Sequence, residues 1–140
     1  MDKSTVSMAQ QIAQAASIFE KQRTGIEPTT VSVVLVDETL VVSLRGALSK
    51  VEKSFATTPQ GASHLQQFHR ELFNSSMEPM RQEIERITGV PVREASVEVE
   101  PASGAVAQVF PTGTMVQVFL LAGKVSAESW SSSDQLPGPP

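Results

Sequence analysis

The sequence has no cysteine and no tyrosine, and six phenylalanines and one tryptophan supply its aromatic side chains. Without cysteine the chain can form neither disulfides nor thiolate metal sites, and a reducing compartment is permitted. Few aromatic side chains disfavour a base-stacking surface for single-stranded nucleic acid. A net charge of −4 and an isoelectric point near 5.1 disfavour the basic face that nucleic-acid binding requires. We therefore expect no nucleic-acid partner.

Long apolar runs are also missing. No stretch approaches the roughly 20 apolar residues that cross a membrane, and Met1–Thr5 lacks the apolar segment of a signal peptide. We expect a cytoplasmic protein without membrane insertion. The length suits one domain, which we place at residues 1–123. Residues 124–140 are rich in Ser, Pro and Gly and are predicted to be a disordered tail, in which Trp130 is either an unbound linker residue or a docking residue.

The first predicted elements are a helix and a hairpin. Apolar residues recur at helical spacing from about Ser4 to Thr24, with Glu20 on the polar face. The apolar face is narrow and rich in alanine, so it packs either on its own domain or on a second subunit. β-Branched residues then dominate Thr29–Val36 and Thr39–Leu44 around a polar Asp37-Glu38 pair, which predicts an antiparallel hairpin.

A corner between strand and helix follows, from Arg45 to Gly61. Ser49 and Glu52 have the spacing of a capping box, in which the Ser49 hydroxyl accepts from the N–H of Glu52 and the Glu52 carboxylate accepts from the N–H of Ser49. We expect a short helix to begin at Lys50. A structural role is favoured, because the sequence shows no base or metal partner for a catalytic Ser or Glu.

A longer helical pattern runs from about Ala62 to Thr88. Pro79 lies inside it, so we expect a break near Ser75–Glu78 with Pro79 in a new first turn. The predicted apolar face contains Leu65, Phe68, Leu72, Met77, Met80, Ile84 and Ile87, with Phe73 as a further candidate.

The C-terminal part predicts a second pair of strands. A third strand follows Val92, with Ala95, Val97 and Val99 facing inward, and a fourth runs from Met115 to Leu121. Residues 105–110 form either a strand or an irregular extension. The whole pattern predicts an α+β fold with an antiparallel sheet of about four strands, covered on one face, in the order α-β-β-α-α-β-β with two or three central helices.

Candidate catalytic or metal-binding residues are few. His64 and His69 are five residues apart, whereas metal-binding pairs prefer three or four, so we expect both on a solvated helix face. Glu94, Glu98 and Glu100 repeat at strand spacing and could collect a cation, but a solvated sheet face is the simpler interpretation. The sequence has no phosphate loop, nucleophile elbow or Asp-based metal loop. We expect no enzyme activity, no metal and no cofactor.

Several short motifs accompany this pattern. They are Gly25-Ile26-Glu27-Pro28, Arg45-Gly46-Ala47-Leu48-Ser49-Lys50-Val51-Glu52-Lys53, Thr58-Pro59-Gln60-Gly61, Met77-Glu78-Pro79 and Ile87-Thr88-Gly89-Val90-Pro91-Val92. Over roughly Ala9 to Leu121 the chain resembles the MpsC family of small bacterial proteins. The family usually has Leu-Thr-x-x-Glu where this chain has Leu48-Ser49-Lys50-Val51-Glu52, a change that keeps the cap. The segment from Glu100 to Thr114 looks longer than is usual in the family.

The resemblance implies a function in a membrane complex. Family members are similar to a soluble partner of transport subunits linked to bicarbonate uptake, cation translocation and membrane potential, and no catalytic residues carry over. We expect a non-enzymatic accessory or regulatory domain that binds protein partners, such as membrane transporter subunits. The alternative is a small-ligand or anion-binding sensor that uses the helix N-terminus. The candidate anion or partner contacts are Arg45, Ser49, Lys50 and Glu52.

The strand pattern also predicts a homodimer. The first strand is apolar on both faces, with Val31, Val33 and Leu35 on one and Val34 and Val36 on the other. One face packs under a helix, and the other needs cover because large exposed apolar patches are uncommon on monomers. Two-fold pairing of sheets or exchanged first helices would bury it. The alternative is a monomer whose own first helix covers that face.

Overall fold

The structure is a computed structural model that describes residues 6–99, 114–126 and 128–130. Its elements in chain order are α1 (Met8–Thr24), β1 (Thr30–Val36), β2 (Thr39–Arg45), α2 (Lys50–Phe55), α3 (Pro59–Ser76), α4 (Glu78–Thr88), β3 (Val92–Val99) and β4 (Met115–Leu121). This order confirms the predicted α+β fold with two hairpin-forming pairs of strands. The break before Pro79 is also confirmed, because it separates α3 from α4 and places Pro79 in the first turn of α4.

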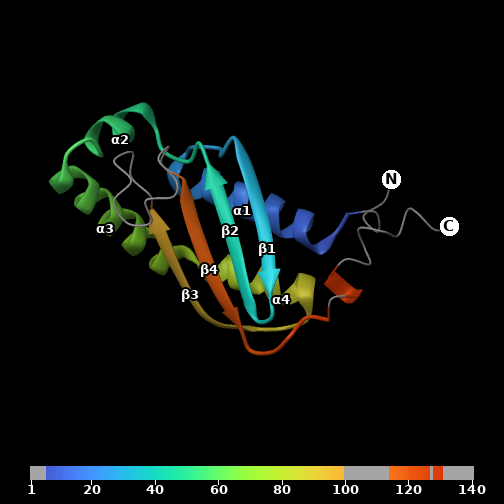
Figure 1. The fold of residues 1–140 in the computed structure, drawn as a ribbon. Helices are drawn as coiled ribbons and strands as arrows, with labels where there is room; N and C mark the ends of the chain where they lie inside the picture. The colour runs from blue at the N-terminus through green and yellow to red at the C-terminus, as the bar shows by residue number, and fades with distance from the viewer. Residues whose placement is uncertain (1–5, 100–113, 127, 131–140) are drawn as a thin grey trace.

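The four strands form one antiparallel sheet in the order β1-β2-β4-β3. The last strand, β4, pairs with β2 on one side and β3 on the other, so β1 and β3 are the edges of the sheet in the described part of the chain. A two-residue turn joins β1 to β2, and its first residue, Asp37, has a φ of 55°. Figure 1 shows α1 and α4 behind the sheet and α3 running beyond its β3 edge, and none of the described helices covers the front face.

The core lies between the central strands and the helices. Alternate side chains of β2 and β4 point to the helical side and are buried, as strand geometry requires. The apolar strand residues of this layer are Leu40, Val42, Leu44, Met115, Phe119 and Leu121, and the polar Gln117 is buried among them. They meet helical side chains that include Ile12, Phe73, Met80 and Ile84. The Phe73 ring meets the Phe119 ring edge to face, with centroids 5.9 Å apart.

Caps set the ends of the first helix. The Ser7 hydroxyl accepts from the N–H of Gln10 at 3.0 Å, and the Gln10 side chain accepts from the N–H of Ser7 at 3.2 Å. This capping box starts α1 at Met8, later than the predicted start near Ser4. Gly25 ends the helix in the left-handed conformation, with a φ of 82°.

Three sequence-based predictions about helix faces are wrong. The buried face of α3 contains Leu65, His69 and Phe73, whereas Phe68 has 54% of its surface exposed. His69 is therefore not on a solvated face, although His64 is exposed. Glu20 of α1, predicted on the polar face, is fully buried. The reason is spacing: residues four apart share a helix face, and these polar residues continue the rows of buried apolar ones.

Some predictions fall outside the described residues. They concern residues 105–110 as a strand or an irregular extension, the longer segment up to residue 113, and residues 131–140 of the tail. Within the described part of the predicted tail, Val125 and Trp130 are partly buried and pack against the core. Trp130 thus contacts its own domain, and the extent of a disordered tail stays a prediction.

Candidate functional site

The corner at α2 contains the residues that the sequence singled out. The Ser49 hydroxyl accepts from the N–H of Glu52 at 3.1 Å, and Oε1 of Glu52 accepts from the N–H of Ser49 at 2.8 Å. The predicted capping box is confirmed. Glu52 therefore already occupies part of the helix N-terminus to which an anion would bind.

The second oxygen of Glu52 makes a contact that the sequence did not reveal. Oε2 of Glu52 lies 2.8 Å from Nε2 of His69 on α3, and His69 is 3% exposed. No side chain of α2 is buried, so this bond is a principal polar attachment of α2 to the helical layer. Glu52 thus caps one helix and fastens it to another.

Close packing also fixes the link between α2 and α3. Gly61 lies against the end of α2, and a Cβ at this position would collide with the carbonyl oxygen of Phe55. The Thr58 hydroxyl accepts from the N–H of Gly61 at 3.0 Å and caps α3. A side chain at residue 61 would therefore force the two helices apart.

The other two predicted contacts, Arg45 and Lys50, are both exposed to solvent. Arg45 ends β2, and Lys50 begins α2. The capping box joins Ser49 to Glu52. Among the described residues, no hydrogen-bond network links all four predicted contacts. Their role as contacts stays a prediction.

A buried ion pair lies near this corner. Nη1 of Arg23 donates to Oε1 of Glu20 at 3.0 Å, with 7% and 0% of the two side chains exposed. The Arg23 guanidinium also lies over the Phe73 ring, 5.6 Å from its centroid. Oε2 of Glu20 and Nε of Arg23 are buried without a hydrogen-bond partner in the described part of the chain. The pair therefore ties the end of α1 to α3 at an electrostatic cost.

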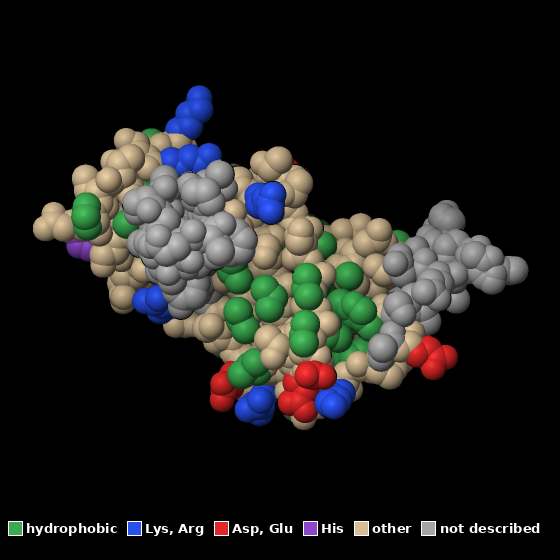
Figure 2. All heavy atoms as spheres, in the orientation of Figure 1, with side chains coloured by type: hydrophobic (Ala, Val, Ile, Leu, Met, Phe, Trp, Pro, Cys, Tyr) green, Lys and Arg blue, Asp and Glu red, His purple; other side chains and the backbone are tan. Residues whose placement is uncertain are grey.

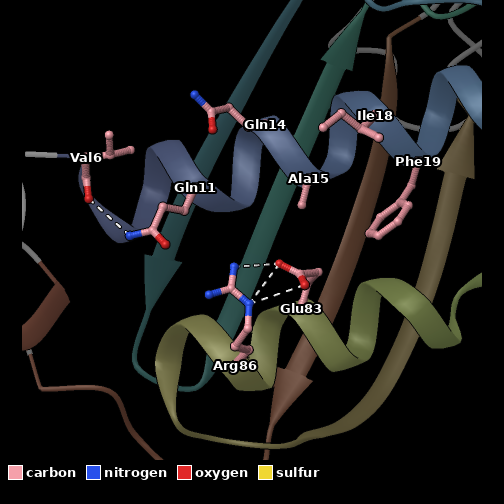
Figure 3. A pocket seen from close by; sticks show the side chains of 8 residues that line it. All are labelled: Val6, Gln11, Gln14, Ala15, Ile18, Phe19, Glu83 and Arg86. Carbon is pink, nitrogen blue, oxygen red and sulfur yellow. Dashed lines mark hydrogen bonds and ion pairs between the residues drawn. The ribbon is translucent and has the colours of Figure 1, made fainter. Parts of the chain in front are cut away.

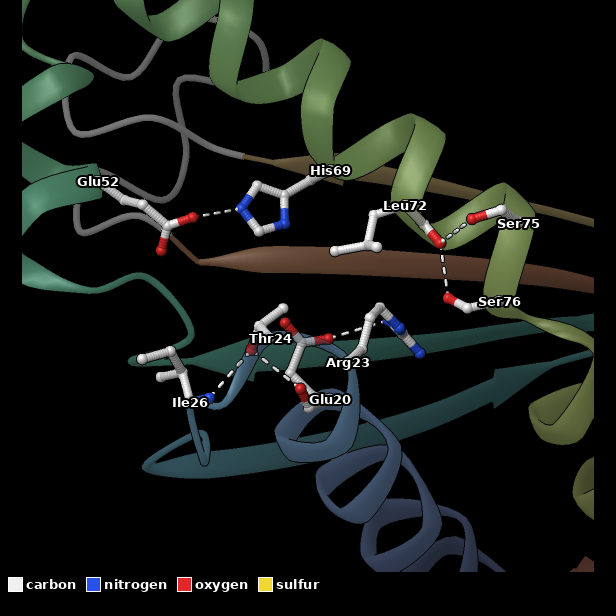
Figure 4. Close-up of polar contacts among 9 residues, drawn as sticks. All are labelled: Glu20, Arg23, Thr24, Ile26, Glu52, His69, Leu72, Ser75 and Ser76. Carbon is white, nitrogen blue, oxygen red and sulfur yellow. Dashed lines mark hydrogen bonds and ion pairs between the residues drawn. The ribbon is translucent and has the colours of Figure 1, made fainter.

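Burial shifts the titration of both members. It raises the pKa of the Glu20 carboxyl, an effect that Arg23 opposes and the nearby Glu52 carboxylate increases. Burial likewise lowers the pKa of the Arg23 guanidinium, against the influence of Glu20. Figure 4 shows Glu20 and Arg23 facing the same region between helices as Glu52 and His69. We call these four residues the polar cluster.

The polar cluster was missed by sequence reasoning, although a signal for it exists. Glu20 follows Ile12 and Ala16 at intervals of four, and His69 stands midway between Leu65 and Phe73. Among the residues that the structure describes, no three His, Cys, Asp or Glu side chains are grouped closely enough to hold a metal ion. The polar cluster joins α1, α2 and α3 through the Glu20–Arg23 ion pair and the hydrogen bond between Glu52 and His69.

A groove lies elsewhere, between α1 and α4, with a volume of about 230 Å³. Figure 3 shows Ala15, Ile18 and Phe19 on its α1 side and the Glu83–Arg86 pair on its α4 side. That ion pair is short, at 2.7 Å, and lowers the pKa of Glu83 chiefly through its hydrogen bond with Arg86. Because the charges of Glu83 and Arg86 compensate each other, the groove has an apolar floor and a rim without net charge.

An exposed apolar surface covers α2 and the start of α3. The exposed fractions of Val51, Phe55 and Phe68 are 78%, 51% and 54%. The His64 ring stacks on Phe55 at 6.4 Å between centroids and lies one helical turn from Phe68. Lys50 and Lys53, both exposed, flank these side chains on α2. We call these six residues the α2 surface.

A second apolar surface is the front of the sheet. Val34 and Val36 on β1 are 54% and 61% exposed. Figure 2 shows hydrophobic side chains gathered over the strands on this side, with charged side chains near one end. The aliphatic members of this open sheet face are Val34, Val36, Val41, Val116, Val118 and Leu120. In the described part of the chain, no helix packs on them.

Comparisons with known proteins agree with the sequence-based resemblance. A curated relative is the uncharacterized protein YbcI of Bacillus subtilis (strain 168), 26% identical over 110 residues, which are 79% of this chain and 89% of YbcI. No solved structure gives a significant match. None of the described helices is long and apolar enough to cross a membrane. The family model described as "Na+-translocating membrane potential-generating system (MpsC)" matches residues 4–114, more than half of the chain, and the protein therefore belongs to the MpsC family.

Proposed function

We propose that this chain is a non-enzymatic accessory domain that binds a protein component of a membrane-potential-generating system. The observation that carries the proposal is the α2 surface, where Val51 and Phe55 project from a helix that buries none of its side chains. Large apolar side chains gathered on a surface mark interaction sites. Bicarbonate uptake as the process served, and a cytoplasmic location, are part of the same proposal.

The charges around the α2 surface indicate the chemistry of the partner. Lys50 and Lys53 flank the apolar side chains, so the partner should present acidic residues around an apolar centre. A lipid surface fits less well, because recognition of anionic lipid typically uses clusters of about four to eight Lys and Arg residues. The chain as a whole carries a net charge of −4. These charges favour a protein partner.

The anion-sensor alternative receives less support from the geometry. The Glu52 carboxylate bonds both the N–H of Ser49 and the His69 ring, so a negative charge already stands where an anion would bind. A role in catalysis is likewise less favoured. The buried Glu20 and Arg23 face each other beneath the surface and do not line the α1–α4 groove.

The test of this function compares binding by variants of the full chain. Membrane vesicles containing the potential-generating system are incubated with the purified protein, and the bound fraction is measured. Phe55→Ser should reduce binding at least about tenfold, since interface energy is concentrated in a few aromatic anchors. Ile18→Ser is the matched control, because Ile18 is 55% exposed but lies on α1. Equal loss from both variants, or equal binding to protein-free anionic vesicles, contradicts the proposal.

We also propose that the protein is a homodimer in which a second copy covers the open sheet face. That face is aliphatic and uncharged at its centre, so two copies can approach without like-charge repulsion. Light scattering at micromolar concentration should give twice the chain mass of 15.0 kDa. Val118→Lys should return the mass to that of one chain. A single-chain mass for the unmodified protein contradicts the dimer.

A further inference from the structure

β1 forms an edge of the sheet that lacks the usual protection against pairing. The chain carries no charge from Pro28 to Val36, and β1 pairs with β2 in unbroken register along all seven residues. Edge strands in natural proteins are commonly blocked by charges, bulges or proline, because their free main-chain groups accept further strands. β1 has none of these features within its length.

The opposite edge, β3, shows the contrast. Pro91 precedes it, the register with β4 is interrupted between Val92 and Glu94, and Arg93 and Glu94 bring charges to its start. Both edges belong to one sheet and face the same solvent. Among the strands that the structure describes, the difference therefore singles out β1 as the edge that is open to pairing.

The main chain of β1 directs a regular set of groups away from β2. The N–H of Leu121 on β4 donates to the carbonyl of Glu38 at 2.8 Å. Successive residues of a strand form their main-chain hydrogen bonds to opposite sides, so the even-numbered residues of β2 bond to β4 and the odd-numbered ones bond to β1. Their partners on β1 are even-numbered. The N–H and C=O groups of Val31, Val33 and Leu35 consequently point outward.

The side chains of β1 are also incompletely covered. Val31, Val33 and Leu35 face the helical layer but are only partly buried, whereas the core side chains of β2 and β4 are at most 1% exposed. Met8 of α1 is partly buried against the same core. One more strand next to β1 would complete the burial of this layer.

The position of α1 argues against a second copy as that strand. Figures 1 and 3 both show the N-terminal end of α1 extending past β1, beneath the place where a new strand would lie. Two copies joined antiparallel at β1 would bring both helix ends under one strand pair. Strands are about 4.8 Å apart, whereas a helix is about 10 Å wide. A single extended segment fits above α1 without this conflict.

We propose that β1 accepts an extended segment of a partner protein as a fifth strand. The segment is uncharged and places aliphatic side chains at alternate positions, where they meet Met8, Val33 and Leu35. Main-chain hydrogen bonds to β1 supply affinity, and the alternate side chains supply specificity. The proposal rests on the protein-binding function proposed above and adds a second contact, distinct from the α2 surface.

The first test asks whether the edge is free in the purified full chain. Hydrogen exchange followed by NMR should show the amides of Val31, Val33 and Leu35 exchanging at least roughly tenfold faster than those of Ser32 and Val34, which bond to β2. Equal protection of both sets would show that the edge is already covered, and would overturn the proposal.

The second test locates the partner. A photo-crosslinking residue replaces Ser32 on β1 or, as the matched control, Ser96 on β3, since both serines are exposed on edge strands. In cells, residue 32 should crosslink to an alternating aliphatic segment of another protein, and residue 96 should not. Ser32 and Ser96 both lie on the open sheet face, so the proposed homodimer gives crosslinks to a second copy from either position, and only crosslinks to other proteins are compared. Equal crosslinking of both residues to another protein, or no crosslink of residue 32 to any protein but this chain, overturns the proposal.

A pair of substitutions tests the hydrogen bonds themselves. Val33→Pro removes an outward N–H and should abolish the crosslink from residue 32, whereas Val33→Thr keeps the N–H and should preserve it. If Val33→Pro does not fold, the exchange measurement on the unmodified chain decides. If residue 32 gives no crosslink in the otherwise unmodified chain while Phe55→Ser still reduces vesicle binding, the added strand alone is refuted. If residue 32 gives no crosslink and Phe55→Ser also leaves vesicle binding unchanged, the proposed function is refuted as well.

Discussion

The buried Glu20–Arg23 pair supports a quantitative prediction about stability. At 3.0 Å the attraction is about 5.5 kcal/mol for an effective dielectric constant near 20. Transfer of each charge from water costs several kcal/mol, so the pair as a whole contributes close to nothing. Removing one member, however, leaves the other buried and unpaired. Glu20→Leu or Arg23→Met should each lower the free energy of unfolding by about 3–5 kcal/mol.

The double variant should be far less damaged than the sum of the single ones. With both charges gone, no desolvated ion remains, and the introduced leucine and methionine side chains would fill the layer beside Phe73. We expect a loss of about 2 kcal/mol or less. Urea unfolding followed by circular dichroism measures all four proteins of this double-mutant cycle.

The surface pair Glu83–Arg86 is the matched control. It has the same spacing and a distance of 2.7 Å, but 34% and 62% of the side chains are exposed. Glu83→Gln and Arg86→Met should each cost below about 1 kcal/mol, as exposed pairs do. Additive losses at Glu20 and Arg23, or losses as small as those of the surface pair, would refute the reasoning.

The same pair predicts a dependence on pH. Burial raises the pKa of Glu20 in the folded state, so folding favours its protonated form. Its contribution to stability is complete below the ordinary carboxyl pKa and is lost as pH rises through the raised folded value. The stability of Glu20→Leu should lack this decline. A variant whose stability falls with pH in parallel with the unmodified protein would assign the titration to another group.

Substitutions at the α2 corner and the hairpin turn give three more expected outcomes, each measured by urea unfolding. Glu52→Ala should cost about 2–4 kcal/mol, because the loss of the cap adds to an unsatisfied, buried His69. Gly61→Ala should cost at least about 2 kcal/mol through its collision with α2, whereas Gly25→Ala meets no atom within 4 Å and should cost only about 1 kcal/mol for its left-handed backbone. Asp37→Gly should raise stability by about 0.5 kcal/mol, since glycine adopts the φ of 55° without strain.

Local rules were enough to predict most of the fold. The Asp37-Glu38 turn between two β-branched runs predicted the first hairpin, and the capping residues Ser49 and Glu52 predicted the start of α2. Pro79 predicted the break between α3 and α4. Each of these signals acts within a few residues, where backbone sterics and caps dominate.

Interpretation of the sequence failed where distant segments meet. Glu20 and His69 are polar residues on buried helix faces, and their partners decide whether burial is tolerated. The ion pair of Glu20 lies within α1, but its burial depends on Phe73, which is far along the chain. The bond between His69 and Glu52 spans 17 residues. The spacing of four places both residues in line with buried apolar ones, but the partners that make their burial tolerable become visible only in the packed structure.

The most direct test of the central claim is photo-crosslinking from the α2 surface in living cells. A crosslinking residue replaces Phe55 and, in the control, Ile18, which is similarly exposed on α1. We predict that residue 55 crosslinks to a protein of the membrane-potential-generating system at an acidic, apolar segment, and that residue 18 does not. Crosslinking from residue 18 alone, or equal crosslinking from both residues, would contradict the proposed function.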